Sequence, residues 1–397
     1  MEINFVYLRS KISKDQRFID SEKESFLALL NANKDFEFSS KGKTMFFIET
    51  GGTEEEFKSI YSKYKEPYII VATNANNSLP ASLEIASFLT QNGKKFFLLH
   101  GTPEDLREQL KNPQKSNKYG TFAMNFKNKI LDNKRYGVVG KPSNWLISSD
   151  VDYLKAKELL GVDLIDVSFD EFSNEIDNAK LVIEPLVFEH LLNKKISNET
   201  LIGALKIYSA LRNIIIKYNL NGLTVRCFDL LGKYENTSCL ALALLNKDGY
   251  IGTCEGDVPA MLTMAIVKET FHQSSFQVNP SYVSLEKGYA YFAHCTLPLD
   301  MAISYKFDTH FESGLGIGIA GKLNHGNVTI FKIDSSLSRF EAFEGHIVEN
   351  LERDNLCRSQ IKVQFKGDIS SLLSDPCGNH LILFYGLHKD ELLSLLK

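Results

Sequence analysis

The stretch Ile251-Gly-Thr-Cys-Glu-Gly-Asp-Val-Pro-Ala260, which an apolar run continues to Phe271, contains both kinds of structure that this 397-residue chain uses. Its first residues predict a strand, and the apolar residues after Pro259 recur at helical spacing. Two carboxylates, Glu255 and Asp257, therefore lie where a strand gives way to a helix. Because α/β proteins bind ligands at the carboxyl ends of their strands, these two acids are candidate functional residues.

The first part of the chain alternates between apolar strands and helical patterns. Strands are predicted at residues 3–8, 44–49, 68–73 and 95–100, and helices at residues 54–63 and 82–91. Such alternation predicts a parallel sheet, so we expect an N-terminal α/β domain over residues 1–130. The loop Thr50-Gly-Gly-Thr-Glu54 has neither a G-x-G-x-x-G nor a Walker pattern, which favours a tight turn over a phosphate site.

A second α/β pattern occupies the middle of the chain and contains the Glu-Gly-Asp element. Strands are predicted at residues 135–140, 162–167 and 223–228, and helices at residues 198–218, 237–245 and 255–271. We therefore expect a second α/β domain, again with a parallel sheet, over residues 131–274.

From about residue 275 the pattern changes to short strand-like runs. They occur at residues 276–278, 288–295, 314–319, 327–334, 361–365 and 381–385. This pattern predicts a C-terminal β-domain over residues 275–397, built as a barrel or a sandwich. The sequence Gly316-Ile-Gly-Ile-Ala-Gly321 lies within it and opens no helix, which indicates strand glycines and not a dinucleotide site.

The composition, with 44% hydrophobic and 24% charged residues, is that of an ordinary globular protein. A net charge of −4 gives no electrostatic reason to expect nucleic acid or an anionic membrane as a partner. The sequence has neither a basic N-terminal region ahead of an apolar run nor a segment of about 18 apolar residues, so we expect a cytoplasmic protein. The six cysteines form no CxxC pair and are expected to be reduced thiols.

Histidines stand near several predicted strand ends in the C-terminal part, at positions 294, 310, 325 and 380. With Glu255 and Asp257 they allow a divalent metal site of mixed oxygen and nitrogen ligands, which suits manganese. A buried structural histidine is the alternative for each position, and a helix cap is the alternative for Asp257. Trp145, the only tryptophan, follows the loop 140–144, where it either lines a cleft or packs in the core.

Several ordered motifs can be read together along the chain. They are Glu49-Thr-Gly-Gly-Thr-Glu54, Asn76-Asn-Ser-Leu-Pro-Ala-Ser-Leu-Glu84, Cys254-Glu-Gly-Asp257, Phe292-Ala-His-Cys-Thr-Leu-Pro298 and Gly378-Asn-His380. Through them the chain resembles, over essentially its whole length, the shorter members of the L-fucose isomerase and L-arabinose isomerase superfamily. The resemblance implies two Rossmann-like parallel-sheet domains followed by a C-terminal β-barrel domain. It also implies a homo-oligomer, a trimer or hexamer, with active sites at subunit interfaces.

Enzymes of this superfamily interconvert an aldose and a ketose through a cis-enediol, with a divalent ion, commonly Mn²⁺, at the sugar's carbonyl and neighbouring hydroxyl. The resemblance therefore implies a metal-dependent isomerase that acts on a pentose, a hexose or a modified sugar. Such chemistry needs a base and an acid for proton transfer between adjacent carbons. By position, Glu255 matches an acid/base glutamate and metal ligand, and Asp257 is the second candidate for a catalytic carboxylate.

The same resemblance provides the other candidate residues. The candidate metal ligands are Glu255, Asn279, His294 and His380. The candidate sugar-binding residues are Trp145, His294, Thr296, His310 and Glu312.

The chain departs from the family pattern in Ser275-Phe-Gln-Val-Asn-Pro280. The metabolic isomerases have a second acidic ligand after this strand, whereas this chain has Asn279, whose amide binds metal weakly and cannot transfer a proton. A carbohydrate-binding or regulatory protein without turnover is therefore the alternative function, and a different enol-type reaction on a sugar acid is a third. The residues that can compensate from other loops are Gln277, Asp300, Asp308 and Glu312.

Overall fold

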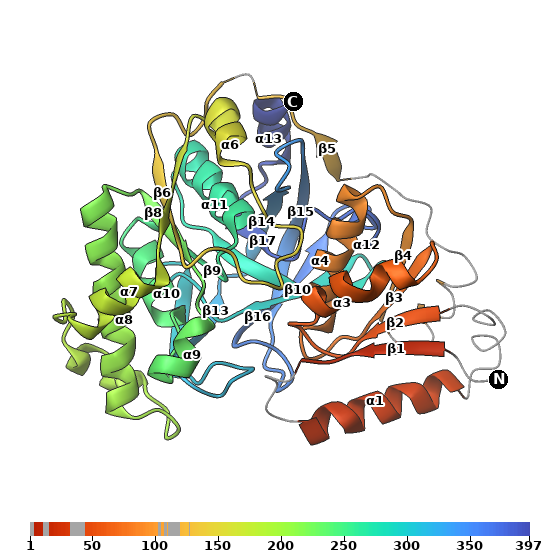
Figure 1. Ribbon diagram of the computed structural model, residues 1–397, viewed down its shortest axis with the longest axis horizontal. Helices are drawn as coiled ribbons and strands as arrows, with labels where there is room; N and C mark the ends of the chain where they lie inside the picture. The colour runs from red at the N-terminus through yellow and green to blue at the C-terminus, as the bar shows by residue number, and fades with distance from the viewer. Residues whose placement is uncertain are drawn as a thin grey trace.

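The computed structural model describes residues 4–10, 16–31, 44–101, 105–106, 109, 120–126 and 128–397. Within these residues, two parallel sheets of four strands each precede a closed antiparallel barrel (Figure 1). The predicted fold class, two parallel-sheet α/β units followed by a β-barrel, is therefore confirmed.

The first sheet is parallel and has the strand order β1-β2-β3-β4. Its strands are β1 (Asn4–Leu8), β2 (Thr44–Ile48), β3 (Tyr68–Ala72) and β4 (Phe96–His100). These bounds agree closely with the predicted strands, except that residue 3 lies outside the described residues. Every residue of β3 is buried, as expected for a parallel strand that is covered on both faces.

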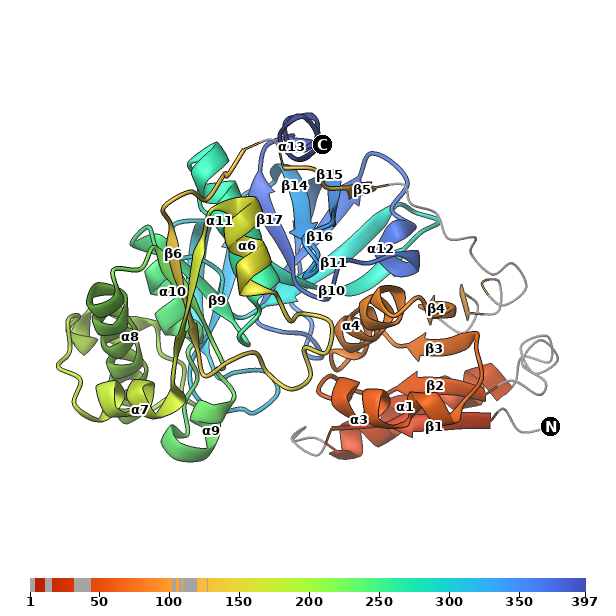
Figure 2. The ribbon, with the colours of Figure 1, turned by 45° about the horizontal axis from the view of Figure 1, so that its top comes forward.

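Helices cover this sheet and connect it to the barrel. They are α1 (Gln16–Asn31), α3 (Glu54–Ile60) with a 3₁₀ turn at Tyr61–Lys63, and α4 (Ser78–Gln91). The helix predicted at residues 82–91 begins earlier, at Ser78, because Pro80 is tolerated in the first turn of a helix. Residues 78–89 are buried on every side, since α4 lies between the first sheet and the barrel strand β10 (Phe276–Ser284) (Figure 2).

The second sheet is also parallel, with the order β7-β6-β8-β9. Its strands are β6 (Arg135–Val139), β7 (Asp163–Val167), β8 (Gly222–Val225) and β9 (Ile251–Cys254). The order reverses between β6 and β8, which creates the crevice where open α/β sheets bind ligands. The helices and 3₁₀ turns of this region are α6 (Tyr153–Leu160), α7 (Phe169–Asp177), η2 (Pro185–Val187), η3 (Glu189–Leu191), α8 (Asn198–Tyr218), α9 (Asp229–Tyr234), α10 (Cys239–Lys247) and α11 (Val258–Phe271).

The helix that follows β9 begins at Val258 and not at residue 255 as predicted. Glu255 and Gly256 have φ values of +64° and +72°, which an α-helix does not allow. Asp257 is the N-cap, and its side chain accepts a hydrogen bond from the backbone N–H of Ala260. Glu255 and Asp257 therefore belong to a sharp turn ahead of the helix, and their side chains have different surroundings.

The barrel closes in the order β14-β17-β10-β11-β16-β15, with β15 paired to β14. Besides β10, its strands are β11 (Tyr289–His294), β14 (Gly326–Ile333), β15 (Arg339–Asn350), β16 (Ser359–Phe365) and β17 (Leu381–Tyr385). Strand β5 (Thr121–Ala123), which falls within the predicted N-terminal unit, pairs with the edge of β15. Helices α12 (Ser371–Ser374) and α13 (Lys389–Leu396) complete this part of the chain.

Strands β12 (Ala302–Asp308) and β13 (Gly318–Leu323) form a separate antiparallel pair. Gly318 and Gly321 of the G-x-G-x-x-G sequence lie in β13, as predicted for strand glycines, whereas Gly316 precedes the strand with a φ of +59°. Within the described ranges, no helix combines the length and the apolar character that a membrane crossing requires.

Candidate functional site

One pocket lies where the carboxyl ends of both parallel sheets meet the barrel. Loops after β1, β2 and β3 contribute to it, as do loops after β6, β8 and β9. Three of its described lining residues are carboxylic acids. None of the described lining residues is lysine or arginine, so an uncharged ligand suits the pocket better than an anion. The lining residues are Ser10, Gly51, Gly52, Glu54, Asn77, Pro80, Ala81, Trp145, Phe228, Glu255, Asn279, Glu312 and Asn379.

Glu255 enters the pocket from the turn between β9 and α11. This turn requires Gly256, because a Cβ there would lie 2.5 Å from the backbone oxygen of Lys141 and 2.7 Å from Pro142 Cα. The turn therefore packs directly on the loop after β6. From that loop, Trp145 Nε1 donates a hydrogen bond to Glu255 Oε2 at 2.6 Å. Trp145 thus lines the cleft, which was one of its two interpretations from the sequence.

Asp257 lies behind the pocket and orients His380 toward Glu255. Its fully buried carboxylate caps α11 and lies 3.2 Å from Lys332 Nζ. His380 Nδ1 donates a hydrogen bond to Asp257 Oδ2 at 2.9 Å, and His380 Nε2 lies 3.5 Å from Glu255 Oε1. A carboxylate in this position fixes the orientation of a histidine ring, as it does behind metal-binding histidines.

The charges of this group stabilise one another. Burial opposes a charge on His380, but Glu255 and Asp257 outweigh it and raise the pKa of His380 to about 9. Burial likewise favours the neutral form of Asp257, yet Lys332 and His380 lower the pKa of Asp257 to about 2. For Glu255 too, the effect of burial is outweighed, and His380 and Trp145 hold its pKa below the usual range. Glu255 is therefore a carboxylate at neutral pH.

Two buried polar atoms, Asn279 Oδ1 in the pocket lining and His380 Nε2 behind it, have no hydrogen-bond partner among the described residues. Such atoms are uncommon in native proteins, and each points to an ion or a water as the missing partner. With the Glu255 carboxylate they offer a nitrogen and oxygen ligand set, which manganese accepts. The donor atoms of these residues suit a divalent ion, but His380 does not belong to the group of described residues whose ligand atoms all lie within 4.8 Å of one another. Binding of an ion at His380 would displace its Nε2 proton.

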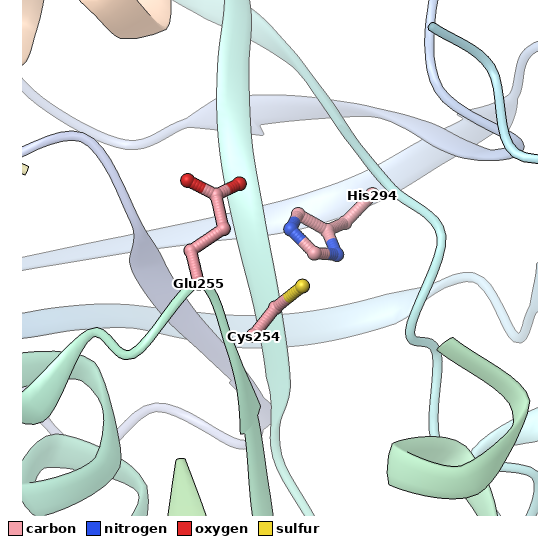
Figure 3. Close-up of side chains that lie close together, drawn as sticks. All are labelled: Cys254, Glu255 and His294. Atoms are coloured by element: carbon pink, nitrogen blue, oxygen red, sulfur yellow. The ribbon is translucent and has the colours of Figure 1, made fainter. Parts of the chain in front are cut away.

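A second group of possible ligands shares Glu255 with the first. Ligand atoms of Cys254, Glu255 and His294 all lie within 4.8 Å of one another (Figure 3). However, Cys254 Sγ lies 3.0 Å from Cys227 Sγ, and this contact together with burial raises the pKa of the Cys254 thiol well above its usual range. Because a protonated thiol is a poor ligand for a hard ion, Glu255 and His294 are the better ligands of this group.

Of the other histidines named from the sequence, His294 and His310 are buried and neutral, whereas His325 is exposed in the turn between β13 and β14. Burial and the neighbouring His380 lower the pKa of His294 to about 3, and Thr296 Oγ1 lies 2.8 Å from its Nδ1. Thr296 therefore supports His294 and does not line the pocket. His310 packs edge-on against Phe228 with ring centroids 5.4 Å apart, and burial lowers its pKa to about 4. It too lies behind the pocket wall.

Two further acids, Glu312 and Glu54, line the same pocket as Glu255. Glu312 was predicted from the sequence, and burial raises its pKa to about 7. Glu54 was not predicted, although it ends a polar loop directly after β2, where the same strand-end rule applies. Burial raises the pKa of Glu54 well above its usual range, and Glu54 Oε2 has no hydrogen-bond partner among the described residues. Asn77 and Phe228 also line the pocket and were not predicted.

The structure thus brings Glu255, Asn279, Glu312 and Trp145 to one pocket, with His294 and His380 beside Glu255. No protein-family model matches the chain, and no curated protein sequence matches it. The resemblance to the sugar isomerases therefore stays a prediction from the motifs.

Proposed function

We propose that the protein is a metal-dependent aldose–ketose isomerase that acts on a pentose, a hexose or a modified sugar through a cis-enediol. The observation that carries the proposal is the Glu255 carboxylate beside two buried atoms, His380 Nε2 and Asn279 Oδ1, that have no hydrogen-bond partner among the described residues. These residues would hold a divalent ion such as Mn²⁺, with His294, whose ring packs against that of His380, as a further ligand.

The chemistry of the surrounding side chains supports this proposal. A bound ion would polarise the sugar's carbonyl and stabilise the charge of the enediolate. Glu255 is ionised and held by Trp145, so it is suited to take the proton from the carbon next to the carbonyl. Asp257 would act through His380, because its carboxylate contacts His380 and Lys332 and does not line the pocket.

The lining of the pocket supports a sugar as the substrate. Trp145 and Phe228 offer aromatic surface to the apolar face of a sugar ring, and the asparagines at 77, 279 and 379 offer amide groups to its hydroxyls. A cytoplasmic homo-oligomer, either a trimer or a hexamer, is part of the proposal and rests on the sequence alone.

The alternative is a carbohydrate-binding or regulatory protein that does not turn its ligand over. Asn279 favours this alternative, because an amide stands where the resemblance implies a second acidic ligand. Both functions use the same pocket and differ in whether the bound sugar reacts.

The test is to incubate the purified protein with Mn²⁺ and a panel of pentoses, hexoses and deoxyhexoses in D₂O. The proposal predicts ketose formation that chelation abolishes, with deuterium at the carbon that receives the transferred proton. Calorimetry on the same sugars separates the two functions: sugar binding without ketose formation would contradict the isomerase and support the binding protein.

A further inference from the structure

We propose that Glu312 is the second proton-transfer residue of this pocket and supplies the acid that Asn279 cannot. The inference rests on the isomerase function proposed above, and it explains how a chain with an amide at position 279 can complete the reaction.

Glu312 lies on the loop between β12 and β13, which is held at both ends. His310 N–H donates a hydrogen bond to the oxygen of Leu315, and Gly314 N–H donates to the oxygen of His310. Arg358 Nε donates a further hydrogen bond to the backbone oxygen of Thr309 at 2.6 Å. The loop therefore carries the Glu312 carboxyl group to a defined position in the pocket.

The N-terminal sheet fixes the other end of the Glu312 side chain. Asn77, the last residue before α4, donates a hydrogen bond from Nδ2 to Glu312 Oε1 at 2.6 Å. The backbone at Gly51 is also close, since a Cβ there would lie 3.5 Å from Glu312 Oε1. With Oε1 held by Asn77, Oε2 is the oxygen left to exchange a proton with a bound sugar.

The other residues that the sequence offered as substitutes for a second acid are engaged elsewhere. Gln277 Oε1 accepts a hydrogen bond from Cys254 N–H, and it lies outside the pocket lining. Asp308 accepts a hydrogen bond from Asn193 and lies beside Arg358, while Asp300 is bonded to Ser274 in a separate surface groove.

Glu54 does line the pocket but is less suited to the role than Glu312. The side-chain oxygen Glu54 Oε2 is closed off from solvent, and only 2% of the residue's surface is exposed. Glu312 retains partial exposure toward the pocket. Burial also raises the pKa of Glu312 to about 7, against the hydrogen bond from Asn77, so both protonation states are accessible at neutral pH.

The two glutamates together can complete the reaction without an external oxidant or reductant. The Glu255 carboxylate takes the proton from C2 of the open-chain aldose. The C2–H electron pair forms the C1=C2 double bond, and the carbonyl π pair moves to O1, which receives the Glu312 proton. Glu312, now ionised, takes the proton of the C2 hydroxyl, whose electron pair forms C2=O, and C1 takes the proton from Glu255. C1 is reduced, C2 is oxidised, and both acids return to their starting states.

The test uses Glu312→Gln in the whole 397-residue chain, with Mn²⁺ and the panel of pentoses, hexoses and deoxyhexoses as probes. Glutamine keeps the acceptor for Asn77 and cannot transfer a proton. We expect kcat to fall about 10²- to 10⁴-fold. Because the reaction starts with Glu312 protonated, the decline of kcat above about pH 7 should vanish from the pH profile of the variant. The manganese affinity and the KM of the variant should stay within about threefold of the wild-type values, because Glu312 is not a metal ligand and only its proton transfer is lost.

Two further variants serve as controls for Glu312→Gln. Glu352→Gln is a matched control, since this glutamate is 69% exposed and pairs only with Lys322 on the surface among described residues; it should leave kcat unchanged. Glu312→Asp keeps a carboxyl group and should recover part of the lost kcat, and it replaces Glu312→Gln if that variant does not fold.

The outcomes separate this inference from the function on which it rests. An active wild type whose kcat is unchanged in Glu312→Gln would overturn the role of Glu312 alone. A parallel loss of manganese binding in Glu312→Gln would also overturn this role, because the loss would indicate that Glu312 is a metal ligand or a structural residue. A wild type that binds manganese but isomerises no sugar would overturn the proposed function itself.

Discussion

Replacement of Lys332 by methionine tests whether the Asp257–His380 unit depends on a buried ion pair. Lys332 and Asp257 are both fully buried, and Lys332 Nζ lies 3.2 Å from each carboxylate oxygen. Methionine keeps much of the lysine's length and removes its charge. Loss of one partner of a buried ion pair costs about 3–5 kcal/mol, because the other charge stays buried, so we expect Lys332→Met to lose stability of this order.

The stability of the protein depends on pH through the pKa of Asp257, which is about 2 in the folded protein against an ordinary value of 3.8. A depressed pKa means that the ionised carboxylate contributes stability above about pH 4, of roughly 2 kcal/mol. This contribution is lost as the pH falls through the folded value. Without Lys332 the pKa of Asp257 rises, so the difference between variant and wild type should be largest at neutral pH and should narrow toward pH 4.

Urea unfolding, followed by circular dichroism and by the fluorescence of Trp145, measures these differences. The series comprises wild type, Lys332→Met, Asp257→Asn and the double variant, since asparagine is also a good N-cap for α11. The double variant should be more stable than the sum of the single losses predicts, because neither charge is then left alone. A loss below about 1 kcal/mol in Lys332→Met at pH 7, or simple additivity in the cycle, would show that Asp257 and Lys332 do not depend on each other's charge.

Two other substitutions test the backbone and the buried acids. Gly256→Ala should lower the free energy of unfolding by about 1–3 kcal/mol, because Gly256 has a φ of +72° and a Cβ there would lie 2.5 Å from the backbone oxygen of Lys141. In the control Gly232→Ala, in α9, the added Cβ meets nothing within 4 Å and should not destabilise the protein. Equal midpoints of thermal unfolding for the two variants would contradict this prediction. Burial raises the pKa of Glu341 to about 8, so the wild type loses stability as the pH rises from about 4.5 through 8. Glu341→Gln should remove that loss, so its free energy of unfolding should gain about 3 kcal/mol relative to the wild type as the pH rises from 4.5 to 7. Urea unfolding measures this gain, and a difference between variant and wild type that does not change with pH would contradict the effect assigned to the burial of Glu341.

Elements with strong periodicity and clear end signals could be predicted from the sequence. Helix α8 has the predicted bounds because Ser197 caps its first turn and Asn219, with a φ of +52°, ends it. Strand β12 was not predicted, because it buries only Phe307 fully and most of its other side chains are exposed or half-buried. Strand β15 was not predicted either, since residues 340–343 are buried in succession, Glu341 among them, and so do not alternate between apolar and polar.

The candidate site was predictable only as far as local chain geometry determines it. Glu255 follows a strand, so its place at the carboxyl end of the sheet could be inferred from the sequence. Its separation from Asp257 could not, because it depends on two successive residues with positive φ. Glu54 and Phe228 reach the same pocket from opposite sheets, and only the packing of the two sheets on the barrel brings them together.

The most direct test of the central claim is the metal content of the purified protein after equilibration with Mn²⁺, measured by elemental mass spectrometry on the wild type and Glu255→Gln. Glutamine has nearly the same shape as glutamate and lacks the charge that a divalent ion requires. We expect near-stoichiometric manganese in the wild type and its loss in the variant. A wild type without manganese at saturating concentration, or a variant that binds as much, would contradict it.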